Sequence, residues 1–207
     1  MPESSTPPRR RLLSTRERAD SIRTAAAAVF ARQGFAATTV DQIAAEAGVS
    51  KLIVYRHFNS KQELYLAILD QVRVRLGQVA TPRDPVDPAD AQAGFRAAVA
   101  TLTGTFAVAR ELPDAFRLLH RHAVHEPEFA GHVADLVDRS REQIEGMLAH
   151  VPDPVLRAWM ARLVDRMVDE AFLEWLDVGD PARDAEMVER LAHLLGGMVG
   201  SLWSPPA

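Results

Sequence analysis

The stretch TVDQIAAEAGVSKLIVYRHF, from Thr39 to Phe58, decides the fold of this chain, because it predicts two short helices joined by a tight turn. Thr39 and Gln42 have the spacing of a capping box, in which a hydroxyl and an amide side chain satisfy backbone amides at a helix start. Gly48 can adopt the left-handed conformation that ends this helix, and Ser50 offers the N-cap of the next one. A short second helix held in this way suits the major groove of DNA.

The second helix of this pair is predicted to have one buried and one exposed side. Val54 and Phe58 are four residues apart and therefore share a face, which we expect to pack against the core. The rest of the helix would lie over the exposed arc and carries polar, aromatic, basic and aliphatic groups: Lys51, Leu52, Ile53, Tyr55, Arg56 and His57.

The helices on either side start with the same signal. Ser14 and Glu17 form a second capping box, opening a helix that Gly34 would end. Ser60 and Glu63 form a third, starting a helix long enough to leave the small domain and contact a second one.

Taken together, the pattern ending ARQGF, the segment TTVDQIAAEAGVSKLIVYRHF and the continuation NSKQELYLAIL resemble the TetR family of bacterial transcriptional regulators. The resemblance covers about residues 15 to 70. It implies an N-terminal three-helix helix-turn-helix domain, followed by a helical domain that binds a ligand and dimerises. In the family, the positions of Thr39, Tyr55, His57 and Lys61 contact phosphates. Ser50, Lys51, Leu52, Ile53 and Arg56 lie where base-edge or nearby backbone contacts would fall.

Three of these residues have alternative interpretations. Tyr55 could instead be a core aromatic, and His57 a capping or packing histidine. At Leu52 and Ile53 the family often has small or polar residues. Two aliphatic side chains cannot hydrogen-bond to base edges but can contact the methyl group of thymine, so we expect thymine contacts here.

Charge and composition divide the chain. Residues 1–80 carry 12 Lys and Arg against 7 Asp and Glu, whereas residues 81–207 carry 12 against 21. A basic first part suggests that this part alone meets a polyanion, although chance variation in surface charge is an alternative. The chain has no cysteine, which excludes disulfides and thiolate metal sites. No stretch resembles a membrane span or a secretory signal, so we expect a cytoplasmic protein that does not enter a membrane.

Four segments are predicted. Residues 1–13 contain Arg9, Arg10 and Arg11 among prolines and serines, and form either a DNA-contacting arm or a solubilising tail. Residues 14–80 would be the helix-turn-helix domain with its connecting helix, and residues 81–88 a proline-rich connection. Residues 89–207 would be a helical regulatory and dimerisation domain, giving an all-α fold of about nine helices.

The last two predicted helices, about 155–176 and 184–203, are broadly apolar and need neighbours on more than one side. Glycines 196, 197 and 200 suggest close approach by another helix. The resemblance implies that these helices pair with their copies in a homodimer; the alternative is the core of one large domain. The tentative interface residues are Leu156, Trp159, Leu163, Met167, Leu191, Leu195, Met198 and Leu202.

The resemblance also implies a pocket for a small apolar inducer in the second domain. Its tentative lining is Phe95, Phe106, Phe116, His120, Met147, Met160 and Phe172, which could equally be a packed core. His120, His122 and His125 lack the spacing of a metal site, so a solvated helix end is expected there, with His120 reaching the cavity. Carboxylates such as Asp165 and Asp169 would form surface ion pairs with arginines. No catalytic motif and no cofactor motif is present, so no enzyme activity is expected.

These patterns predict a DNA-binding regulator that acts as a homodimer on a palindromic double-stranded operator and responds to a ligand. A repressor is the favoured interpretation. The alternatives are a sequence-independent DNA-binding protein and a helical small-molecule-binding protein or enzyme whose N-terminal domain is vestigial.

Overall fold

The computed structural model describes residues 14–79, 91–149 and 151–203, and these residues form helices joined by short turns. The all-α prediction is confirmed, and the last helix has the predicted bounds. The predicted arm, 1–13, and the predicted connection, 81–88, lie outside the described residues. The α-helices within this part of the chain are α1 (Thr15–Ala37), α2 (Val40–Glu46), α3 (Lys51–His57), α4 (Lys61–Val79), α5 (Ala91–Glu111), α6 (Pro113–Leu118), α7 (Pro127–Met147), α8 (Pro154–Val178) and α9 (Asp184–Trp203).

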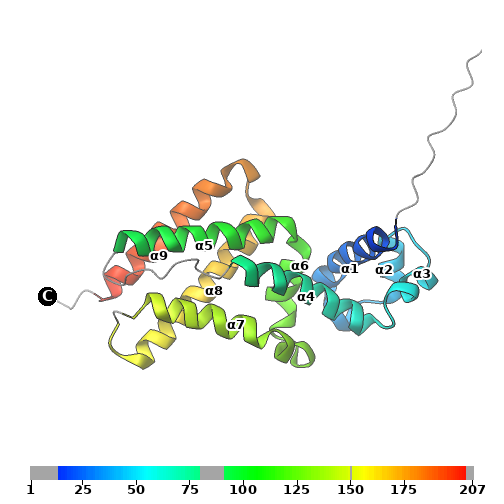
Figure 1. Ribbon diagram of the computed structural model, residues 1–207, viewed down its shortest axis with the longest axis horizontal. Coiled ribbons are helices and arrows are strands. Elements are labelled where there is room, and N and C mark those ends of the chain that lie inside the picture. Colours follow the sequence, from blue (N-terminus) through cyan, green and yellow to red (C-terminus); the bar gives the residue numbers. More distant parts are fainter. Residues whose placement is uncertain (1–13, 80–90, 150, 204–207) are drawn as a thin grey trace, which may run out of the picture.

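Helices α1 to α3 form a head at one end of the molecule, and α5 to α9 form the body, with α4 running between them (Figure 1). The head begins with the predicted capping box, because the Ser14 hydroxyl accepts a hydrogen bond from Glu17 N and the Glu17 carboxylate accepts one from Ser14 N. Near the end of α1, Gly34 has φ 75°, which a side chain would strain. The three helices enclose Ile22, Phe30, Ile43 and other apolar side chains.

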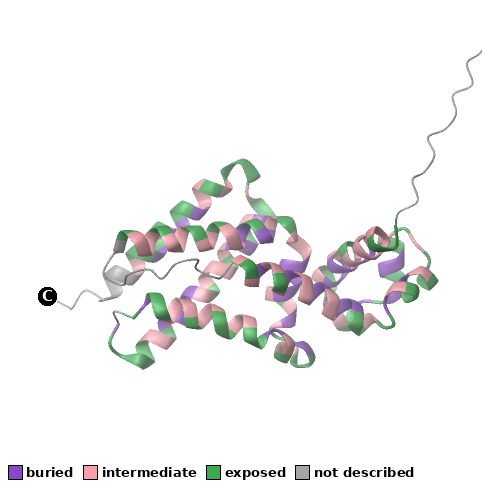
Figure 2. Ribbon diagram, in the orientation of Figure 1, coloured by how far each residue is buried: buried purple, intermediate pink, exposed green. Residues whose placement is uncertain are grey.

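The core of the head continues into the body. Tyr65 on α4 is fully buried, and its ring packs edge-on against Phe30 and Phe35 of α1. On its other side it lies 4.2 Å from the ring of Phe129 on α7, centroid to centroid. Buried residues therefore run without interruption from the head through α4 into the body (Figure 2). A displacement of α4 or α7 would change the packing under the head, because close-packed cores transmit strain.

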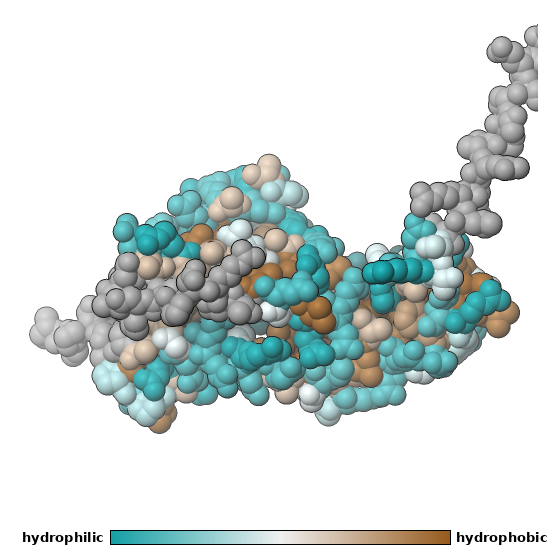
Figure 3. Space-filling model, in the orientation of Figure 1, coloured by the Kyte–Doolittle hydropathy of each residue, from teal (hydrophilic) through white to brown (hydrophobic). Residues whose placement is uncertain are grey.

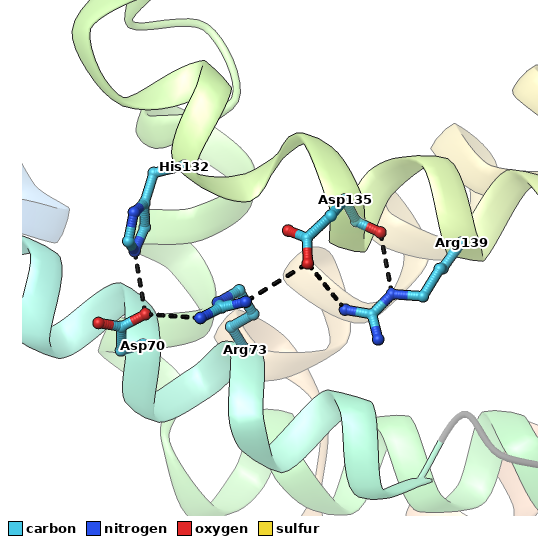
Figure 4. A network of polar contacts seen from close by, with 5 residues as sticks. All are labelled: Asp70, Arg73, His132, Asp135 and Arg139. Atoms are coloured by element: carbon cyan, nitrogen blue, oxygen red, sulfur yellow. Dashed lines mark hydrogen bonds and ion pairs between the residues drawn. The ribbon is translucent and has the colours of Figure 1, made fainter.

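A chain of polar contacts also joins α4 to α7 (Figure 4). Asp70 on α4 lies 3.0 Å from both His132 Nε2 and Arg73 Nη2. Arg73 reaches 3.4 Å to Asp135 on α7, and Asp135 pairs in turn with Arg139. Because these groups are half-buried or exposed, the contacts position the two helices more than they stabilise the fold.

The body consists of two helix pairs, in which α5 lies along α9 and α7 along α8. Pro113 and Pro127 occupy the first positions of α6 and α7, where proline fits because it lacks the amide that is unsatisfied there anyway. Between them lies an unpredicted π-helical turn, η1 (Leu119–Ala123), and a short 3₁₀ turn, η2 (Pro181–Arg183), precedes α9. Among the described residues, no helix is long and apolar enough to cross a bilayer.

Candidate nucleic-acid interface

The turn between α2 and α3 has the predicted geometry. The Thr39 hydroxyl accepts a hydrogen bond from Gln42 N at 3.3 Å, while Gln42 Oε1 accepts one from Thr39 N at 2.8 Å. Gly48 follows with φ 63°, and Val49 N then donates to the carbonyl of Ala44 at 3.0 Å. These bonds satisfy both ends of a helix of only seven residues, so α3 leaves the turn in a defined direction.

Helix α3 has one buried and one exposed face. Val54 and Phe58 are 2% and 7% exposed, which confirms their prediction as core residues. Leu52 is 71% exposed and Tyr55 is 44% exposed, so Tyr55 is not a core aromatic. Figure 3 shows hydrophobic surface among hydrophilic atoms at this end of the molecule. The exposed face thus presents a large aliphatic group beside a phenol.

Ile53 corrects one expectation about this face. It was predicted to be exposed, but it is half-buried and packs against the core of the head. Its position one residue before Val54 places it at the boundary between the two faces of α3. Of the two aliphatic residues, Leu52 is therefore the exposed one.

The polar side chains of α3 differ in their contacts and in their exposure. Lys51 Nζ forms an ion pair of 2.9 Å with Asp41 on α2, which raises the pKa of Lys51 through that hydrogen bond and the nearby negative charge. Arg56 is exposed and His57 is half-buried. Ser50 stands at the N-cap position, yet its hydroxyl forms no cap hydrogen bond within the described part of the chain. Ser50, Lys51, Tyr55 and Arg56 are all exposed at the surface of the head, where a duplex can reach them.

Lys61 has a structural role that the sequence did not reveal. Its Nζ donates hydrogen bonds to the carbonyls of Phe35 and Thr38, at 2.7 Å and 2.8 Å, and lies 4.1 Å from the centre of the Phe35 ring. It thereby satisfies carbonyl groups at the end of α1. Two of the three donors of the Lys61 ammonium are used in this way.

The head matches a known family. Residues 22–68 fit the family described as "Bacterial regulatory proteins, tetR family". This match identifies residues 22–68 as a TetR-type N-terminal domain. The fit spans α1 to α4 from Ile22 onward and includes the whole helix-turn-helix.

Curated relatives named as HTH-type transcription regulators match part of the chain. An activator named FasR, from Mycolicibacterium smegmatis, is 49% identical over 55 residues, which are 27% of this chain and 25% of that protein. A repressor from Streptomyces coelicolor is 40% identical over 63 residues, which are 30% of this chain and 32% of that protein. The chain thus spans only a quarter to a third of the length of these relatives. Both are named as transcription regulators, in agreement with the expectation that the chain is not an enzyme.

Solved TetR-family structures extend the likeness to the fold of the body. A TetR-like regulator from a Rhodococcus species has a TM-score of 0.71 at 24% identity, covering 92% of this chain and all of that one. The fatty acid degradation regulator FadR from Bacillus halodurans has a TM-score of 0.63 at 14% identity, covering 97% and 99%. At these identities the likeness establishes the fold alone.

The residues predicted to line a ligand pocket are not gathered around one cavity. Phe106, Phe116 and Phe172 pack against one another in the core, which was the alternative interpretation. Met160 belongs to a separate buried cluster, Met147 is 49% exposed, and Phe95 stacks against His193. The three phenylalanines therefore fill the interior and leave no pocket between them, because an unfilled apolar cavity lowers the stability of the fold.

A cavity of about 1080 Å³ lies elsewhere in the body, between α4, α5, η1, α7 and α8. His120 lines it, as predicted, and is the one member of the predicted pocket that does so. The other polar lining residues include Ser140, Asp165 and Asp169. Asp165 was predicted to lie in a surface ion pair, but its side chain is only 13% exposed.

The residues predicted for the dimer interface differ in their exposure. Leu156 and Trp159 are 36% and 49% exposed on α8, while Leu163, Met167 and Met198 are half-buried. Leu191 and Leu195 correct the prediction: they are buried within the chain, because this face of α9 packs against α5. The side chain of Leu202 lies outside the described residues. Leu194, which was not predicted, is 59% exposed.

The joint between head and body contains residues that the sequence analysis did not place there. Glu126, at the N-cap position of α7, accepts hydrogen bonds from the Tyr65 hydroxyl at 2.6 Å and from Phe35 N at 3.3 Å. His122 Nε2 lies 3.1 Å from the carbonyl of Ala31 on α1. His122 is therefore half-buried at this joint and not at a solvated helix end, whereas His125 is exposed. Within the described part of the chain, no group of three or more acidic or histidine ligands is placed to hold a metal ion.

Proposed function

We propose that this protein is a DNA-binding transcription regulator that acts as a homodimer on a two-fold symmetric operator. The observation that carries the proposal is the exposed face of α3, where Leu52, Tyr55 and Arg56 stand clear of the core on a helix that follows the capped helix α2. A helix of this kind fits the major groove, where side chains can read base edges.

The distribution of charge supports the same orientation on DNA. The basic excess lies in residues 1–80 and the acidic excess in residues 81–207. A polyanion is attracted to the first part and repelled by the second. The head would thus face the duplex while the body points away from it.

Exposed apolar groups support the dimer. Val155, Leu156 and Trp159 near the start of α8 are 76%, 36% and 49% exposed, and Leu194 on α9 is 59% exposed. Within the described residues, nothing lies within 4 Å of a Cβ built on Gly196 or Gly197, so that surface of α9 is open to close approach. Two recognition helices related by a two-fold axis would reach half-sites about 34–36 Å apart.

The body supports ligand-responsive regulation. His120 of η1 lines the cavity, and two residues later His122 of the same turn contacts α1 of the head. A ligand that favours one position of η1 would favour one position of the head, because a ligand shifts a conformational equilibrium toward the state it binds better. The curated relatives include both an activator and a repressor, so a helix-turn-helix of this kind serves either direction of regulation.

Selection of bound fragments from the genomic DNA of the source organism, with the purified full chain, tests the proposal. We expect enrichment of an inverted repeat, and a mass of two chains per operator by sedimentation or light scattering. Substituting Tyr55→Ala and Arg56→Ala together should abolish enrichment while leaving the helical content unchanged. Recovery of random fragments would instead favour a sequence-independent DNA-binding protein, and tight binding by a monomer would exclude the dimer.

A further inference from the structure

The cavity of the body has an unusual inner wall for a chain predicted to bind an apolar inducer. Its volume of about 1080 Å³ lies at the upper end for a small-molecule site. Leu119, Val133 and Leu173 form apolar parts of the lining. The remaining lining includes five carboxylates against three guanidinium groups, so the surplus charge is negative.

Two of these carboxylates lie on one face of α8, because Asp165 and Asp169 are four residues apart. Asp165 is the more enclosed, with 13% of its side chain exposed against 33% for Asp169. The Ser140 hydroxyl donates a hydrogen bond of 2.7 Å to Asp165. Arg141 Nε stays 3.7 Å from its other oxygen, which is too long for a hydrogen bond.

The charge of Asp165 is therefore incompletely balanced. Burial raises the pKa of its carboxyl, and the nearby charge of Asp169 raises it further, while Ser140, Arg141 and His120 act in the opposite direction. The net direction is upward, which means that the folded protein disfavours the ionised form. A positive group entering the cavity would reverse this balance.

His120 lines the same wall. Its Nδ1 lies 2.9 Å from Asp169 Oδ2, and a carboxylate only accepts hydrogen bonds, so Nδ1 carries a proton. The opposite ring nitrogen, Nε2, is buried and has no hydrogen-bond partner within the described residues. Because solvent does not reach Nε2, we assign His120 the role of holding Asp169 in place and leave contact with a ligand to the two carboxylates.

We propose that the cavity binds an organic cation, with a protonated amine held by Asp165 and Asp169 and an apolar body along Leu119, Val133 and Leu173. An ammonium group fits because it offers several donors and no acceptor, whereas an ionised carboxylate only accepts hydrogen bonds. The inference rests on the proposed function, since it names the chemical class of the regulatory ligand. It replaces the expectation of an uncharged apolar inducer.

Calorimetric titration of the purified full chain with three ten-carbon compounds tests this inference. Decylamine, decanol and decanoate have the same apolar chain and differ in the charge of the head group. We expect decylamine to bind one site per chain at least about tenfold more tightly than either of the others, as a charge-assisted hydrogen bond is worth more than a neutral one. Equal affinity for decanol, or tighter binding of decanoate, would overturn the inference.

Variants locate the binding within the protein. Asp165→Asn and Asp169→Asn should each weaken decylamine binding about tenfold or more and leave decanol unaffected. Glu174→Gln is the matched control, because Glu174 is exposed on the same helix and does not line the cavity. If Asp165→Asn fails to fold, by circular dichroism, Asp169→Asn and Ser140→Ala decide the result. Unchanged binding in the folded variants would place the cation elsewhere and refute the site.

The titration needs no DNA, so the two proposals fail separately. Decylamine binding without any DNA binding would refute the regulator and leave the cation site standing. Operator binding without a preference for the amine would refute the cation site alone.

Discussion

The hydroxyl of Tyr65 donates a 2.6 Å hydrogen bond to the carboxylate of Glu126, joining the connecting helix α4 to the first turn of α7. The same carboxylate accepts a bond from Phe35 N on α1. One side chain of the body thus holds α1 of the head and the connecting helix α4 beside a cluster of four aromatic rings. The position of the head depends on this joint, since both elements would lose a partner if α7 moved.

Tyr65→Phe should lower the free energy of unfolding by about 1–3 kcal/mol, because it leaves a half-buried carboxylate without its strongest donor. Burial, followed by the Glu126 hydrogen bond, raises the pKa of Tyr65. Its contribution to stability is therefore complete below the unfolded pKa of about 10 and is lost as the pH rises through the higher folded value. Urea unfolding at neutral pH measures the loss, and Tyr55→Phe, at the exposed second tyrosine of the chain, should show none.

Lys61→Met should also destabilise the head, by about 1–3 kcal/mol, because the carbonyls of Phe35 and Thr38 lose their charged donor. Lys51→Met is the matched control at the other lysine of the chain, whose partner Asp41 is exposed. We expect little change in thermal stability there, since surface ion pairs contribute little. If Lys61→Met weakens DNA binding with no loss of stability, its role is phosphate contact alone.

Leu52 should read the methyl group of thymine. Replacing thymine by deoxyuridine at the contacted position removes only that methyl group, and should weaken operator binding by the wild type about fourfold, from burial worth about 0.8 kcal/mol per methylene-sized group. Leu52→Ala should bind both operators equally and lose more specific than non-specific affinity. Fluorescence anisotropy at fixed salt measures all four combinations. A uracil effect that persists in Leu52→Ala would assign the contact to another residue.

Asp184→Asn should destabilise the body at neutral pH by about 1–3 kcal/mol, because Asp184 accepts hydrogen bonds from Arg110 at 2.8 Å and from Trp175 Nε1 at 2.8 Å. These partners, Arg110 first, lower the pKa of Asp184. The stabilisation is present above the unfolded pKa of about 3.9 and is lost as the pH falls through the lower folded value. Unfolding measured from pH 7 down to pH 2 should show the difference from wild type shrinking, with Glu189→Gln, exposed on the same helix, as the unchanged control.

Asp165→Asn should have the opposite pH dependence. Because the pKa of Asp165 is raised in the folded state, proton binding stabilises the fold fully below the unfolded pKa of about 3.9, and this contribution is lost as the pH rises through the folded value. The variant should therefore be at least as stable as the wild type at pH 7. Its free energy of unfolding should rise less than that of the wild type as the pH is lowered. Unfolding measured from pH 7 down to pH 2 gives the free energy of unfolding of both proteins. Marked destabilisation at pH 7 would mean that the Ser140 hydrogen bond outweighs the cost of burying the charge.

Local signals in the sequence determined the helices and the head. Thr39 and Gln42 cap α2 through bonds between neighbouring residues, and Gly48 ends the turn through its own backbone freedom, so each acts wherever the rest of the chain lies. The four-residue spacing of Val54 and Phe58 likewise placed both in the core. These features also carried the resemblance to the TetR family.

Tertiary structure alone decided which polar groups meet across the molecule and which apolar groups stay exposed. Helices distant in sequence bring together the partners of these contacts: Lys61 caps α1, Glu126 accepts a hydrogen bond from Tyr65, and Asp165 lines a cavity. The periodicity of the sequence does not predict which helices become neighbours. The phenylalanines predicted for a pocket became core for the same reason, since packing depends on the volumes of neighbours from other helices. The two helices between Thr39 and Phe58 could thus be predicted from the sequence. The joint between head and body and the cavity of the body could not, because both are formed by residues distant in sequence.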